Sequence, residues 1–136
     1  MKRPLLLLNI LLLCLFLASS LPAVDRFERL KSRVKDGVDF YRDGPFTISR
    51  LGKNPLSGSL TAIRGFITND TNKRAVSVQL EVTCYNQAGD PIGSQLVELD
   101  YLNPRETRSF QAKIKRDAEE VTLYEAAVQD VIWEEL

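Results

Sequence analysis

The pattern of apolar and polar residues divides the chain into three parts. Leu5 to Ala18 is an almost unbroken apolar run that follows two basic residues. From Val24 to Tyr41 apolar residues recur every three or four positions, the spacing of one helix face. Beyond Pro45 the period falls to two, which is typical of β-strands. We therefore predict a signal segment at 1–23, an amphipathic helix or linker at 24–44 and a β-domain at 45–136.

The first part has the three features of a secretory signal peptide. Lys2 and Arg3 supply the positive start, the apolar run follows, and small residues come next at Ala18, Ser19, Ser20 and Ala23. This order of charge, apolar run and small residues is typical of a segment removed during export, here after Ser20 or Ala23. We expect the domain to be exported and to work in the periplasm or outside the cell.

Two alternatives to cleavage stay open. The apolar run has 14 residues, and a helix that spans a membrane needs about 20, which disfavours an uncleaved N-terminal anchor without excluding it. Lipidation at Cys14 is disfavoured because a lipoprotein signal has a small residue before the modified cysteine, and Leu13 stands there. In each case the positive start directs the domain out of the cytoplasm.

The second part predicts one amphipathic α-helix. Charged residues occupy its other faces, and Gly44-Pro45 ends it. Three roles stay open: packing on its own domain, self-association as a coil, or lying on a membrane surface. The apolar face consists of Val24, Phe27, Leu30, Val34, Val38 and Tyr41.

The third part predicts a mainly β fold. In the clearest strand, Ala75 to Tyr85, one face carries Val76, Val78, Leu80, Val82 and Cys84, and the alternate residues, ending with Tyr85, face solvent. The other strands are predicted at Phe46–Leu51, Leu60–Ile67, Ile92–Leu102, Thr107–Ile114 and Val121–Trp133, although Glu125–Val128 also fits a helix. Short strands with regular turn signals indicate an immunoglobulin-like antiparallel β-sandwich of about six or seven strands.

Three stretches of this domain resemble the FxLYD family of small immunoglobulin-like sandwiches, found mostly in exported or membrane-anchored bacterial proteins. They are Gly65-Phe-Ile-Thr-Asn69, the run from Val82 to Gly93, and Leu102-Asn-Pro-Arg-Glu-Thr-Arg-Ser-Phe110. The namesake motif departs from the family because Cys84 replaces an aromatic residue and Asn86 replaces the aspartate. The resemblance covers about residues 60–114. It implies the fold and carries over no catalytic residue.

Charge and composition exclude several functions. Removing residues 1–23 leaves 16 basic and 18 acidic side chains, which argues against nucleic-acid binding because phosphate contacts need a basic face. The chain has no histidine, and so lacks the commonest general base and metal ligand. No serine lies in a nucleophile motif. We expect no enzyme, no cofactor and no bound metal.

The remaining polar candidates have simpler explanations. Cys84, the one thiol left after cleavage, falls on the apolar face and is predicted to be a buried small hydrophobe. Asn69-Asp70-Thr71 matches a glycosylation acceptor, but a turn asparagine is the favoured interpretation. The oxygens of Asp70, Asn72, Asn86 and Asp90 lack the regular spacing of a calcium loop.

The leading hypothesis is a non-enzymatic binding or structural module of the cell envelope with a protein partner. The candidate contacts are Tyr85, Tyr101 and Trp133, together with exposed strand edges to which a partner strand can add. The alternative is a carrier that holds a small molecule or lipid between the sheets. Any membrane contact is expected only through an uncleaved N-terminal segment, and the pattern leaves the oligomeric state open.

The mass of the protein recovered after export tests the signal prediction. We expect the chain to lack residues 1–20 or 1–23. A full-length mass in the membrane fraction would show an anchor instead, and a chain that starts at Cys14 with added lipid would show a lipoprotein.

Overall fold

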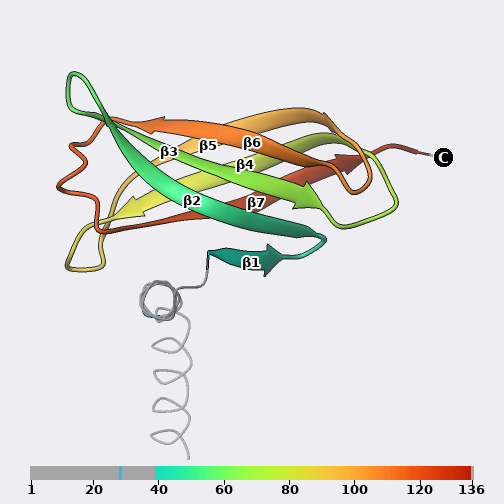
Figure 1. Ribbon diagram of the computed structural model, residues 1–136, viewed down its shortest axis with the longest axis horizontal. Helices are drawn as coiled ribbons and strands as arrows, with labels where there is room; N and C mark the ends of the chain where they lie inside the picture. Colours follow the sequence, from blue (N-terminus) through green and yellow to red (C-terminus); the bar gives the residue numbers. More distant parts are fainter. Residues whose placement is uncertain (1–27, 29–38, 136) are drawn as a thin grey trace, which may run out of the picture.

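The protein is described by a computed structural model that covers Glu28 and residues 39–135. Seven strands form two antiparallel sheets, with the order β1-β2-β3-β6 in sheet A and β5-β4-β7 in sheet B. The two sheets make a sandwich (Figure 1), and the predicted mainly β class is confirmed. The strands are β1 Phe40–Asp43, β2 Phe46–Leu56, β3 Leu60–Asn69, β4 Ala75–Tyr85, β5 Pro91–Leu102, β6 Thr107–Ile114 and β7 Leu123–Trp133.

The strand order matches an immunoglobulin-type sandwich in which one outer strand differs. β2, β3 and β6 occupy the positions of strands A, B and E, while β5, β4 and β7 correspond to C′, C and F. An immunoglobulin domain has a further strand, G, beside F. Within residues 39–135 no strand pairs with the outer edge of β7, and β1 instead extends the other sheet beside β2.

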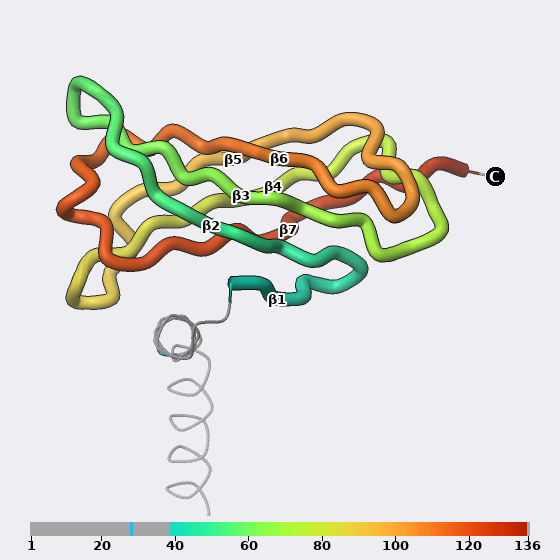
Figure 2. The backbone as a smooth tube through the Cα atoms, in the orientation of Figure 1, coloured from blue at the N-terminus to red at the C-terminus, as the bar shows by residue number. Residues whose placement is uncertain are grey.

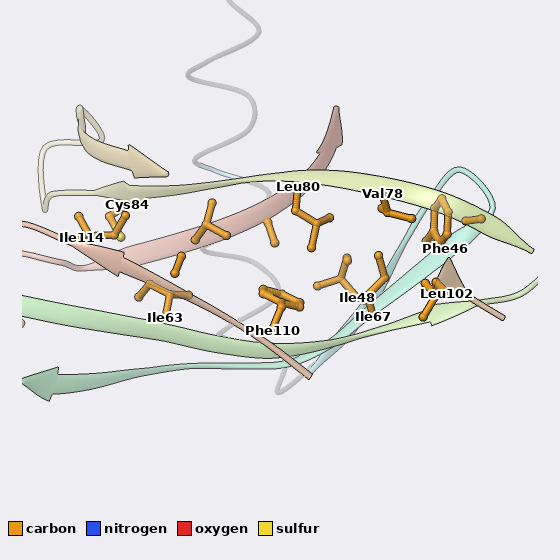
Figure 3. Close-up of a cluster of buried hydrophobic side chains, with 14 of the residues drawn as sticks. Phe46, Ile48, Ile63, Ile67, Val78, Leu80, Cys84, Leu102, Phe110 and Ile114 are labelled. Atoms are coloured by element: carbon orange, nitrogen blue, oxygen red, sulfur yellow. The ribbon is translucent and has the colours of Figure 1, made fainter. Parts of the chain in front are cut away.

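Apolar side chains fill the space between the sheets (Figure 3). Val78, Leu80 and Cys84 of β4 point into this layer from sheet B. Ile63 and Phe110 point into it from sheet A. Its other fully buried members include Phe46, Ile48, Ile67, Ala75, Val82 and Leu102. Burial of this surface is the main force that holds the two sheets together.

The predicted alternation along β4 holds in its centre and fails at both ends. At the start, a shift in the pairing with β7 between Ala75 and Ser77 puts Ala75 in the core and leaves Val76 only partly buried. At the end, a shift in the pairing with β5 follows Cys84, and both Cys84 and Tyr85 are buried. The prediction that Tyr85 faces solvent is therefore wrong, because irregular pairing breaks the period of two.

The helix predicted for Val24 to Tyr41 extends too far along the chain. Glu28 is helical, but Phe40 and Tyr41 lie in β1. Gly44 and Pro45 form the two-residue turn between β1 and β2 rather than a helix end. Gly44 has a φ of +59°, which suits the first central position of a type II′ hairpin turn, and proline supplies the negative φ that follows.

Several predicted features lie outside the described residues. These are the signal segment at 1–23 with Cys14, and residues 24–27 and 29–38 of the predicted helix. Within the described part, no helix has the length and hydrophobicity needed to cross a membrane. The helical interpretation of Glu125–Val128 is wrong, since these residues lie inside β7 and pair with β4.

Asn69 fixes the turn between β3 and β4. Its fully buried side-chain amide donates to the carbonyl oxygens of Lys73 and Leu102, at 2.7 and 3.2 Å. Its side-chain oxygen accepts from the backbone N–H and the hydroxyl of Thr71, at 3.1 and 2.7 Å. This confirms a turn asparagine. A buried amide that makes these bonds is incompatible with an attached glycan.

Replacing Asn69 with alanine tests this role. Asn69→Ala leaves the buried carbonyls of the turn without their donor, so we expect it to lower the free energy of unfolding by about 2–3 kcal/mol. Asn72→Ala, in the same turn but exposed, is the matched control and should cost less than about 0.5 kcal/mol. Urea unfolding measures both, and equal effects would contradict the assignment.

Candidate interaction surfaces

The three aromatic residues predicted as partner contacts do not form one patch. Tyr85 is only 5% exposed and packs with Leu123 at one end of sheet B. Tyr101 and Trp133 lie at the opposite end, beside the first residues of β4. Eleven residues of β4 separate the two ends, about 33 Å at the rise of a strand. A single contact surface cannot use all three residues unless it runs the length of the sheet.

Tyr101 and Trp133 differ in their surroundings. Tyr101 is 52% exposed, has a φ of +57° and lies under the guanidinium of Arg74, 4.7 Å from the ring centre. Trp133 is partly buried, and its ring stacks on that of Phe46 with 5.7 Å between centres. Tyr124, another aromatic of β7, is also partly buried, and burial raises its pKa. Tyr101 is therefore the most accessible of the predicted contacts, and its role with a partner stays a prediction.

Cys84 has the properties of a core residue. Its side chain is fully buried and unpaired with another cysteine. Burial raises the pKa of the thiol to about 11, and the nearby Lys53 opposes this only in part. A thiol that stays protonated near neutral pH is a poor nucleophile. The prediction of a buried small hydrophobe is confirmed.

The polar turn residues cannot combine into one ion site. Asp70 and Asn72 follow β3, whereas Asn86 and Asp90 belong to the turn after β4. The two turns lie at opposite ends of the sandwich (Figure 2). The side chain of Asp70 instead accepts from Thr47 at 2.5 Å, and that of Asn86 accepts from the backbone of Asp90. In residues 39–135, no three His, Cys, Asp or Glu side chains are grouped to hold a metal.

The remaining hydroxyl and carboxyl candidates are dispersed over the fold. Ser57 and Ser59 lie in the turn after β2, Ser94 lies in β5 and Ser109 in β6. The pair Glu119–Glu120 lies in the turn before β7, and Glu120 forms an ion pair with Arg116. Chemistry that needs several of these groups at one point has no support in this arrangement.

Side chains of β1 cover part of the outer edge of β7. The hydroxyl of Tyr41 donates to the carbonyl oxygen of Ala126 and accepts from the N–H of the same residue. A carboxylate oxygen of Asp43 accepts from the N–H of Val128 at 2.7 Å. These bonds join the two sheets and occupy backbone groups that a partner strand would need. We call this contact the first seam.

A second seam closes the opposite side of the sandwich, between β5 and β6. Arg108 donates to the carbonyl oxygens of Asp100 and Tyr101, and Arg116 donates to that of Ile92 at 2.9 Å. The side-chain oxygen of Gln95 accepts from the backbone N–H of Lys113. A surface hollow of about 440 Å³ lies along this seam, between residues 92–95 and 113–116.

Glu106 holds Arg108 in place for the second seam. The carboxylate binds the guanidinium at 2.8 Å and accepts from the backbone N–H of Asn103 at 3.0 Å. The bond from Asn103, followed by that from Arg108, lowers the pKa of this carboxyl. Both seams occupy backbone groups, so strand addition at these positions would first have to break existing bonds.

The outward face of sheet A is basic. Three exposed basic residues occupy outward positions of the pairing register: Arg42, Arg64 and Lys113. Arg50 lies in the irregular part of β2 with its guanidinium 5.9 Å from the ring centre of Phe66. The strands of this sheet contain six Lys or Arg and one acidic residue, Asp43. Three of these side chains bond across the sandwich: Asp43 in the first seam, Arg108 in the second, and Lys53 to the carbonyl oxygens of Ala118 and Val121. Four basic side chains remain for the outward face.

A shallow hollow lies in the middle of this basic face. Its volume is about 350 Å³, and its lining includes Arg50, Arg64, Phe66, Ser109 and Gln111. The side-chain oxygen of Gln111 accepts from Arg64 at 2.9 Å, which holds that guanidinium beside the hollow. The hollow thus combines an aromatic ring with two cationic groups.

The outward face of sheet B is acidic. Its three strands contain no Lys or Arg and five acidic residues, Glu81, Glu98, Asp100, Glu125 and Asp130. All five occupy outward positions of the pairing register. Two large apolar side chains lie among them, Leu96 and Ile132, which are 55% and 58% exposed. The sandwich therefore carries opposite charges on its two broad faces.

Sequence reasoning missed this segregation although the residues were visible. The charge of each strand would have revealed it, if the charges had been summed over the strands of one sheet rather than along the chain. Some strands that follow each other in the sequence belong to different sheets, as β3 and β4 do, and β5, β6 and β7 alternate between the two. The near-zero total charge therefore conceals two charged faces.

Comparisons with known proteins show a shared fold. No protein-family model matches the chain, and no curated protein matches it. The chain is similar to the crystal structure of a DUF1425 family member from Shewanella sp. pv-4, with a TM-score of 0.50 and 18% sequence identity. The match covers 68% of this chain and 88% of that protein. At this identity, the similarity supports the architecture and leaves the function to the surfaces described above.

Removing one hydroxyl tests the first seam. Tyr41→Phe deprives the N–H and carbonyl of Ala126 of this hydrogen-bond partner, so we expect the free energy of unfolding to fall by about 1–2 kcal/mol. Tyr101→Phe makes the same chemical change at an exposed position and should cost less than about 0.5 kcal/mol. Urea unfolding compares the two variants. Equal stabilities would show that the seam contributes nothing.

Proposed function

We propose that this chain is exported and acts without catalysis as a binding module of the cell envelope, with a protein as its partner. The export signal at residues 1–23 supports the location, and the resemblance to the FxLYD family supports the same setting. Opposite charge on the two broad faces is the observation that carries the proposal. A face of one charge attracts surfaces of opposite charge and repels surfaces of like charge. It therefore raises the rate of association with a complementary partner and disfavours other partners.

The arrangement favours contact through the faces over contact through the edges. At both seams, side chains already occupy backbone groups of the outer strands. The faces instead present charged side chains around partly exposed apolar ones, Phe66 on sheet A and Leu96 on sheet B. An apolar centre with a charged surround is the usual composition of a protein interface.

The alternative of a carrier has less support. A ligand between the sheets needs a cavity of several hundred Å³, and the layer there is filled by the side chains of the core. The two hollows of about 350 and 440 Å³ lie on the basic face and along the second seam, at the surface.

Photo-crosslinking in intact cells tests the proposed function. Three glutamines provide matched positions for a photoreactive amino acid: Gln111 on the basic face, Gln79 on the acidic face and Gln87 at the tip of the β4–β5 turn. We expect protein adducts at Gln111 or Gln79 and none at Gln87. Mass spectrometry identifies the adduct. Exported protein that gives no adduct from either face, or equal adducts from all three positions, would contradict the proposal.

A further inference from the structure

The basic face has an apolar row between two sets of charges. Phe40, Ser49, Phe66 and Ser109 pair in one row across all four strands of sheet A. Phe40 is 59% exposed and Phe66 is partly exposed. One flank contains Arg42, whose guanidinium lies 3.9 Å from the carboxylate of Asp70. The other contains Arg50 and Arg64 beside the hollow.

The acidic face also has apolar side chains next to charged ones. Leu96, Glu81 and Ala127 pair in one row across sheet B. Glu98 and Asp130 pair with Gln79 in the next row on one side. Glu125 pairs with Thr83 in the next row on the other side. The middle row of this face thus has Glu81 between two apolar side chains, and acidic residues lie in the rows on both sides.

The spacing of the two faces permits direct pairing. Both are β-sheets, so neighbouring strands lie about 4.8 Å apart and outward residues of one strand about 6.7 Å apart. Charges on one face can therefore lie opposite charges on the other over several rows. The exposed side chain of Leu96 is small enough to enter the hollow of about 350 Å³ beside Phe66.

We propose that the basic face of one copy docks on the acidic face of a second copy, with Leu96 seated beside Phe66 and with Arg50 and Arg64 opposite acidic residues such as Glu81 and Glu98. The inference rests on the proposed function and names its partner. The two faces are different surfaces, so the contact is head-to-tail. The docked pair leaves one face of each charge free, and assembly continues as an open stack or closes as a ring.

The area available predicts a weak contact. Three strands of about ten residues present a face of about 14 by 33 Å, at the low end for specific protein interfaces. Association should therefore need a high local concentration, such as that on a surface where the chains are confined. It should weaken as salt screens the charges.

Charge reversal in pairs tests the docking on protein purified after export. One variant, Arg50→Glu with Arg64→Glu, makes the surroundings of the hollow acidic and leaves Arg42 and Lys113 in place. The other, Glu81→Lys with Glu98→Lys, makes the residues around Leu96 basic and leaves Asp100, Glu125 and Asp130 in place. Sedimentation velocity at low salt should show concentration-dependent association of the unmodified protein, and each variant alone should remain a monomer.

An equimolar mixture of the two variants is the decisive sample. At the residues that meet in the proposed docking, both faces of one variant are then acidic and both faces of the other are basic, so association should return as an alternating stack. The control variant, Asp117→Lys with Glu119→Lys, makes the same change in charge as Glu81→Lys with Glu98→Lys, but in the exposed turn before β7. It should associate like the unmodified protein. Circular dichroism and thermal unfolding verify that all variants are folded.

Several outcomes would overturn the inference. Unmodified protein that stays monomeric at low salt and millimolar concentration contradicts it, as does a mixture that does not restore association. Monomeric protein that instead binds vesicles with anionic lipid, and loses this on reversal of Arg50 and Arg64, assigns the basic face to a membrane. The protein could also stay monomeric while reversal of Glu81 and Glu98 speeds proteolysis of the chain before Phe40. That result would show that the acidic face binds the chain's own segment before Phe40 instead of a second copy. A crosslink from Gln111 to a different protein would then leave the proposed function intact.

Discussion

The apolar layer between the sheets is the constraint on which the rest of the structure depends. In a strand, residues that point inward commit their neighbours to point outward, so filling this layer also fixes the composition of both outer faces. The fit is close at Gly65, where an added Cβ would lie 2.9 Å from the ring of Phe110 and 2.7 Å from the side chain of Leu51. The ring of Phe110 and the side chain of Leu51 can therefore cover β3 on the inner side of sheet A only with glycine at that position.

The alternating pattern predicted the strands best where nothing interrupts it. β4 and β6 have the predicted bounds, because apolar and polar residues alternate in the sequence of both strands. In β4 the burial follows this alternation only in the centre. The prediction failed at the ends of β4, where irregular pairing buries Tyr85, and at β1, where Phe40 and Tyr41 also fit a helical spacing. A strand of four residues depends on tertiary bonds such as that of Tyr41 to Ala126, which no local pattern contains. The charged faces were not predicted for a related reason. The charge of a face depends on which strands share a sheet, and no local pattern shows that.

The two seams and the two faces divide the surface by function. At the seams, hydrogen bonds across the sandwich satisfy backbone groups on outer strands, so part of the polar surface serves stability and protection against unwanted strand pairing. On the faces, the charged side chains of Arg64 and Glu98 bond to residues of their own sheet, Gln111 and Ser77. Their segregation adds nothing to the core and brings repulsion among like charges within each face. This is the physical reason to assign the faces to recognition.

The central claim is that the broad faces, and not the strand edges, make the contacts of this protein. Backbone amide chemical shifts of the protein, recorded over a dilution series at low salt, test it most directly. The account predicts concentration-dependent shifts at outward positions of both sheets, around Arg64 and Phe66 on one and Glu81 and Leu96 on the other, which disappear at high salt. Shifts confined to the outer edges of β5 and β7, or spectra that do not change with concentration, would contradict it.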